Sequence, residues 1–150
     1  MRRLLLSGIL LALLGAVLWA APNAWAAPLS KRYEFKDGVI LEMAAPATSG
    51  LRLDTVRFRV PAPRGDRLLP TGGPMTAEVA VSNTAEQAHM VGLAIALYDD
   101  EGHLLAVASG GNRIAPVRPD RQQTFNLVFD GVTAEAHKAT AFQISLEAKP

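Results

Sequence analysis

The side chains best suited to binding a partner are four arginines that lie close together in the sequence. Arg57 and Arg59 alternate with apolar residues in a predicted strand, and side chains two apart on a strand point to the same face. Arg64 and Arg67 follow in the loop 61–74, which is rich in Pro and Gly. Such a cluster is typical of a solvated face that protects an edge strand, or of a docking patch for an acidic partner or a polysaccharide. We take the four arginines as candidate partner-binding residues.

His89 and Met90 form a second candidate site, because imidazole and thioether ligands together favour copper. Four further side chains are possible companions, namely Met43, Met75, His103 and His137. No H-x-M or M-x-x-M motif and no His-rich cluster accompanies the pair, and Met is also common in protein cores. The sequence therefore keeps a copper-type metal site at His89 and Met90 as an alternative, and it predicts no resident cofactor.

Two further polar motifs are explained by turns and loops. Asp99-Asp100-Glu101-Gly102 gathers carboxylates as a Ca²⁺ site does, but it lacks the ligand spacing of an EF-hand. Asp and Gly are also the residues that a hairpin turn requires. Arg64-Gly65-Asp66 matches a cell-adhesion tripeptide, yet it lies in a loop where Gly and Asp are expected.

No catalytic motif is present in the sequence. The chain lacks a G-x-S-x-G elbow and contains no Cys, which excludes cysteine nucleophiles, Cys-ligated zinc and iron–sulfur clusters. A hydrolase would need His89, His103 or His137 beside a carboxylate and a Ser in a cleft, because such sites are defined by geometry. We therefore expect a protein that is not an enzyme.

The elements that must position these residues are β-strands. Between Met75 and Ala108, apolar residues recur at every second position and polar turns interrupt them, which predicts a β-meander of half-buried antiparallel strands. Gly92, Ala94 and Ala96 make one face of its middle strand small, and we expect a neighbouring element to approach closely there.

The rest of the chain adds further strands. Asp37-Gly38 between two alternating runs predicts a hairpin of 33–36 with 39–42. Strands are also predicted over 51–60, 124–130 and 139–148, with an edge segment at 114–119 and a helical turn within 131–138. Seven or eight short antiparallel strands and no long helix predict a single all-β immunoglobulin-like sandwich.

The N-terminus has the composition of a secretory signal helix. Met1-Arg2-Arg3 is positively charged, residues 4–21 are apolar, and Ala24-Trp25-Ala26 fits an A-x-A cleavage box. Cleavage after Ala26 would leave one domain over 27–150, which begins with a short leader at 27–31 and has its best-defined core at 75–148. The apolar run is also just long enough to act as an uncleaved anchor. We expect a general secretory signal peptide over 1–26 and a periplasmic or secreted protein without membrane insertion after cleavage.

The charge balance argues against a polyanionic partner. Removing Arg2 and Arg3 lowers the formal net charge from +1 to −1. A nearly neutral domain has no electrostatic basis for binding nucleic acid or an anionic membrane surface.

Residues of the meander carry a family resemblance. The pattern V-x-V-x-N, followed by L-Y-D-x-x-G and by a Pro that leads into F-x-L-x-F, resembles the FxLYD-type domains, which are immunoglobulin-like sandwiches of exported bacterial proteins. The matching residues are Val79, Val81, Asn83, Leu97, Tyr98, Asp99, Gly102, Pro119, Phe125 and Phe129. Ile95 replaces the leading Phe, and Asp120 replaces the Gly that usually follows Pro. The resemblance covers 75–148 and implies a fold and an extracytoplasmic location, without any active-site residues.

These observations favour a non-enzymatic binding or accessory module of the bacterial cell envelope. Such a module would contact an envelope protein through a strand edge or the loop 61–74. Two further hypotheses stay open, a copper-type metal carrier and a structural subunit of a larger envelope assembly.

Overall fold

The regular structure of the described residues consists of strands and two short 3₁₀ turns. The computed structural model describes residues 29–61, 73–130 and 136–149. Their strands are β1 (Leu29–Glu34), β2 (Ile40–Pro46), β3 (Leu51–Arg59), β4 (Met75–Asn83), β5 (Met90–Tyr98), β6 (Leu104–Gly111), β7 (Arg121–Phe129) and β8 (Ala141–Lys149). Two short 3₁₀ turns complete the order, η1 (Thr48–Gly50) after β2 and η2 (Ala136–Lys138) before β8.

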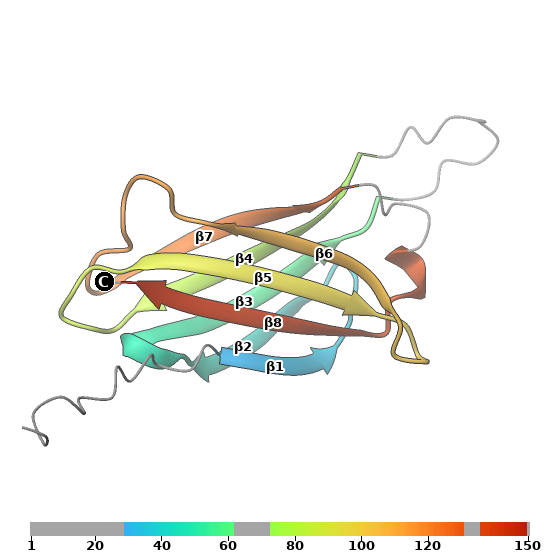
Figure 1. The fold of residues 1–150 in the computed structure, drawn as a ribbon, viewed down its shortest axis with the longest axis horizontal. Helices are drawn as coiled ribbons and strands as arrows, with labels where there is room; N and C mark the ends of the chain where they lie inside the picture. The colour runs from blue at the N-terminus through green and yellow to red at the C-terminus, as the bar shows by residue number, and fades with distance from the viewer. Residues whose placement is uncertain (1–28, 62–72, 131–135, 150) are drawn as a thin grey trace, which may run out of the picture.

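The eight strands form two four-stranded antiparallel sheets that pack face to face as a sandwich (Figure 1). One sheet has the order β1-β8-β5-β6, and the other has the order β2-β3-β4-β7. The prediction of an all-β sandwich of seven or eight strands is confirmed.

The core lies between the sheets because apolar side chains alternate along every central strand. β7 shows the pattern clearly: Phe125, Leu127 and Phe129 are buried while the residues between them are exposed. The rings of Phe58 on β3 and Phe142 on β8 meet edge to face with centroids 4.9 Å apart, which joins the two sheets. In a domain without disulfides, this packing is the main source of stability.

The predicted pairing of neighbouring strands is wrong at two places. The segments around Asp37-Gly38 do not form a hairpin, because β1 pairs with β8 and β2 pairs with β3. Asp37-Gly38 instead carries the chain from one sheet to the other, where the N–H of Gly38 donates to the carbonyl of Phe58 at 3.0 Å. β4 and β5 likewise belong to different sheets, so that only β5 and β6 of the expected meander are paired. Alternation specifies the buried face of a strand but not its neighbour.

Two segments that were expected to be peripheral are integrated into the sandwich. Leu29, Ser30 and Lys31, which belong to the expected leader, pair with β8 as the first half of β1. Val117 lies in the expected edge segment 114–119, yet it is buried and forms an isolated bridge with His89. The helical turn expected within 131–138 is present as η2, and residues 131–135 lie outside the described ranges.

A β-bulge in β3 shapes the outer surface of the second sheet. The register of β3 with β4 shifts between Leu53 and Thr55, which leaves Asp54 as the additional residue. Asp54 therefore points to the outer face together with Thr55 and the arginines that follow. Across the described ranges, no helix has the length and hydropathy needed to cross a bilayer.

Candidate functional site

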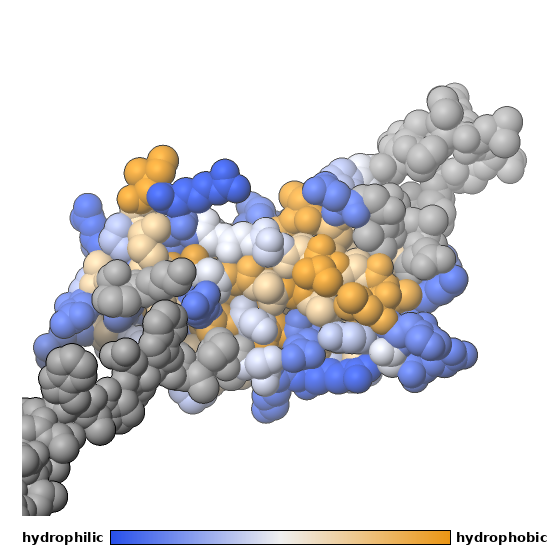
Figure 2. Space-filling model, in the orientation of Figure 1, coloured by the Kyte–Doolittle hydropathy of each residue, from blue (hydrophilic) through white to orange (hydrophobic). Residues whose placement is uncertain are grey.

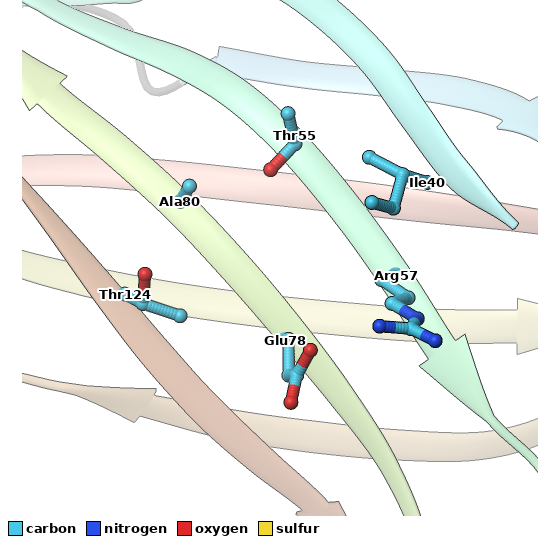
Figure 3. A pocket seen from close by; sticks show the side chains of 6 residues that line it. All are labelled: Ile40, Thr55, Arg57, Glu78, Ala80 and Thr124. Carbon is cyan, nitrogen blue, oxygen red and sulfur yellow. The ribbon is translucent and has the colours of Figure 1, made fainter. Parts of the chain in front are cut away.

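The outer face of the sheet β2-β3-β4-β7 carries a shallow depression (Figure 3). Its volume is roughly 150 Å³. Six outward-facing side chains from all four strands line it, namely Ile40, Thr55, Arg57, Glu78, Ala80 and Thr124. Thr55 pairs with Ala80, which pairs with Thr124, so the small Ala80 side chain lies between two hydroxyl groups. One end of the depression is therefore small and hydroxylated, and the other end carries the apolar Ile40 and the charged Arg57 and Glu78.

Of the two candidate arginines that the structure describes, Arg57 lines this depression. Its Nε is buried and has no hydrogen-bond acceptor, and no carboxylate of the described residues lies within ion-pairing distance of its guanidinium group. The neighbouring Glu78 is engaged elsewhere, because Arg59 Nη2 lies 3.1 Å from its Oε1. A buried donor without an acceptor costs about 1–3 kcal/mol of stability. Arg57 is thus a cation that the described fold leaves without a partner.

The buried carboxylate of Asp54 lies next to Thr55, beside the depression. Asp54 is only 8% exposed and accepts hydrogen bonds from Arg52 Nε at 2.6 Å, from Gln122 Nε2 at 2.8 Å and from the hydroxyl of Ser82. Burial raises the pKa of Asp54, but these three donors and the charge of Arg52 outweigh it and hold the pKa below its ordinary value. Asp54 is therefore an ionised structural group that ties β3, β4 and β7 together.

Two of the four candidate arginines belong to the loop 61–74. Arg64 and Arg67, together with the Arg64-Gly65-Asp66 tripeptide, lie outside the described residues. Of the four predicted partner-binding residues, Arg57 and Arg59 share the outer face, as the strand pattern predicts. Of these two described arginines, Arg57 lines the depression and Arg59 does not.

The predicted metal ligands His89 and Met90 do not converge. His89 is buried, its backbone forms two hydrogen bonds with Val117, and its Nδ1 has no partner. Met90 is half-buried at the start of β5, and successive side chains on extended backbone point in opposite directions. Of the possible companions, Met75 lies in the core. The copper-type alternative gains no support from this arrangement and stays a prediction.

The acidic turn between β5 and β6 is held by its own residues. The backbone N–H of His103 donates to Asp99 Oδ1 at 2.7 Å. The ring Nδ1 of His103 lies 3.2 Å from Asp99 Oδ2 and 3.3 Å from Glu101 Oε2. Slight desolvation raises the pKa of Asp99, and the hydrogen bonds from His103 outweigh this effect and lower it. Within the described ranges, no group of three or more His, Cys, Asp or Glu residues is arranged to hold a metal ion.

The opposite face of the sandwich differs in character. Figure 2 views the molecule from the side of β5 and β8, and apolar atoms gather there over the β5–β6 side. The exposed apolar side chains of β6 are Leu104 and Val107. The small residues Gly92, Ala94 and Ala96 stay partly accessible next to β6, so the close approach expected there is not seen among the described elements.

Most of the depression could not be identified from the sequence. Nothing in the sequence around Thr55, Ala80 and Thr124 marks these residues as part of a site. They lie next to one another only because β3, β4 and β7 are neighbours in the sheet. The alternation around Arg57 identified the correct face of β3, but the pairing of β4 with both β3 and β7 brings the other residues beside it. In comparisons with protein-family models, with curated proteins and with solved structures, no significant match to this chain was found.

Proposed function

We propose that this protein is a non-enzymatic binding module of the bacterial cell envelope that contacts a partner protein through the outer face of the sheet β2-β3-β4-β7. One observation carries the proposal: Arg57 lies in an open depression of this face, and no carboxylate of the described residues pairs with its guanidinium group. A cation without a counterion is available to pair with an anionic group of a partner.

The cellular setting of this proposal comes from the sequence. The basic N-terminus, the apolar run and the Ala24-Trp25-Ala26 box support export through the general secretory route, with cleavage after Ala26. The pattern L-Y-D-x-x-G supports an immunoglobulin-like domain of the FxLYD type. Many cell-surface domains share this sandwich architecture, and the role in partner recognition draws on that analogy of fold together with the site around Arg57.

The test is affinity purification of the protein from its own envelope with chemical cross-linking, followed by mass spectrometry. We expect one partner to be recovered reproducibly and to be lost when Arg57 and Arg59 are both changed to Glu. Arg118→Glu is the control for a reversed charge, because Arg118 is exposed in the segment between β6 and β7 and does not line the depression. Equal recovery with the double variant and the control would contradict the proposed surface.

A further inference from the structure

We propose that Arg57 binds a carboxylate of the partner protein, namely that of an Asp or Glu side chain on an extended segment. This inference rests on the proposed function and names the chemistry of the same site. It follows from the hydrogen-bond donors of the depression, from the size of the depression, and from the lack of aromatic side chains on the outer face of the four described strands.

The donors of the site are matched to a carboxylate. The terminal nitrogens of Arg57 are rigidly spaced, and a guanidinium group pairs with a carboxylate through two parallel hydrogen bonds. Glu78, which lines the same depression, does not fill this role because it is paired with Arg59 at 3.1 Å. The hydroxyl groups of Thr55 and Thr124 add neutral donors at the other end. The site therefore holds one uncommitted cation and two hydroxyls.

The size of the depression suits one side chain. Its volume of roughly 150 Å³ gives room for the carboxyl end of a single Asp or Glu. Ile40 supplies an apolar wall beside Arg57, which suits the methylene groups that precede a carboxylate in Asp and Glu. An extended segment would suit the flat outer face, because alternate side chains of a strand point to one side.

A protein side chain is favoured over an acidic sugar by the composition of this face. Sugar rings commonly stack on aromatic side chains, whose faces provide a flat apolar surface. None of the outward-facing side chains on the four described strands of this sheet is aromatic. Surface that is polar, flat and lacking aromatic rings is better suited to a peptide.

The other charged groups of this face determine how selective the site is. Arg52 and Asp54 are paired with each other, as are Arg59 and Glu78, and Glu42 stands exposed beside Thr55. Glu42 would repel a second carboxylate placed over β2. A single carboxylate above Arg57 is therefore favoured over a densely acidic segment.

The experiment measures binding of defined probes to the protein purified after export. An acetylated and amidated peptide with one central Glu among Ser and Thr residues is titrated while backbone amide NMR shifts are recorded. The control probes are the same peptide with Gln and the sugar acid galacturonate. We expect the Glu peptide to shift the amides of Thr55, Arg57 and Thr124, and to bind at least about tenfold more tightly than the Gln peptide.

Two variants separate the chemistry from an effect on folding. Arg57→Gln is expected to weaken binding of the Glu peptide by about tenfold or more and to leave the Gln peptide unaffected. Arg57→Lys keeps the charge but loses the planar fork, so we expect an intermediate affinity. Equal binding of the Glu and Gln peptides, or shifts with galacturonate alone, would overturn the carboxylate-peptide proposal. The proposed function would survive that result if Arg57→Gln still abolished recovery of the envelope partner.

Discussion

Asp54 on β3 accepts a hydrogen bond from Gln122 on β7 at 2.8 Å, although β4 lies between the two strands. Ser82 of the intervening β4 donates to the same carboxylate. The bulge at Asp54 makes this contact possible, because it directs the side chain onto the outer face. This carboxylate therefore joins three strands next to the depression that contains Arg57.

The network around Asp54 predicts a stability effect that depends on pH. Because the folded-state pKa of Asp54 lies below its ordinary value of 3.8, its contribution is complete above that value and is lost as the pH falls through the folded-state pKa. We expect Asp54→Asn to lower the free energy of unfolding by about 1–3 kcal/mol at neutral pH, and the difference from wild type to shrink below pH 3.8. Urea unfolding at several pH values measures this difference in the free energy of unfolding. Glu42→Gln, which removes an exposed carboxylate of the same sheet, is the control, and a difference that grew on acidification would contradict this role.

Asn83 is predicted to hold one end of the sandwich. Its side chain is fully buried and donates to the carbonyls of Gln87 and Val117 at 2.7 and 2.9 Å, while its Oδ1 accepts the N–H of Ala85 at 2.9 Å. We expect Asn83→Ala to lower the free energy of unfolding by about 2–3 kcal/mol, because buried backbone groups lose their partners. Thermal unfolding checks this against Asn126→Ala, an exposed position on β7. Similar melting temperatures for the two variants would refute the role of Asn83.

Gly111 at the end of β6 is predicted to be intolerant of any side chain. Its φ is 150°, and a Cβ built there would lie 2.0 Å from the carbonyl oxygen of Val91. We expect Gly111→Ala to destabilise the domain by at least about 2 kcal/mol. Gly92→Ala on the neighbouring β5 is the matched control, because its Cβ would meet Glu147 at 3.7 Å, which is an ordinary contact. Chemical denaturation gives the free energy of unfolding of both variants. Equal values would contradict the prediction, because they would show that the backbones of β5 and β6 can move apart at Gly111 without a cost in stability.

Arg57 is predicted to favour binding at the expense of stability. Arg57→Met retains a long apolar side chain and removes the buried donor that lacks an acceptor. We expect its free energy of unfolding to equal that of wild type or to rise by about 1 kcal/mol, while recovery of the envelope partner is lost. Arg59→Met, which removes an exposed ion pair with Glu78, is the control for loss of a cation. Marked destabilisation by Arg57→Met alone would indicate a structural role for this arginine instead.

The sequence predicted which face of each strand is buried better than it predicted which strands pair with one another. Alternation along β7 correctly placed Phe125 and Phe129 in the core, and it placed Arg57 on an outer face. It did not show that β5 leaves the sheet of β4, because a polar segment can turn a hairpin or cross between sheets. The role of Asp54 was also not predicted, since its donors Ser82 on β4 and Gln122 on β7 lie beside it only in the folded arrangement.

The central claim is that the outer face around the depression contacts a partner, and site-specific photo-cross-linking in the living cell tests it most directly. A benzophenone side chain placed at Thr124 lies at the depression, whereas one placed at Ser109 lies on exposed β6 of the other sheet. We predict a discrete cross-linked product from Thr124 that is absent from Ser109 and disappears when Arg57→Gln is added. A product from Ser109 alone, or a Thr124 product that persists with Arg57→Gln, would contradict the account.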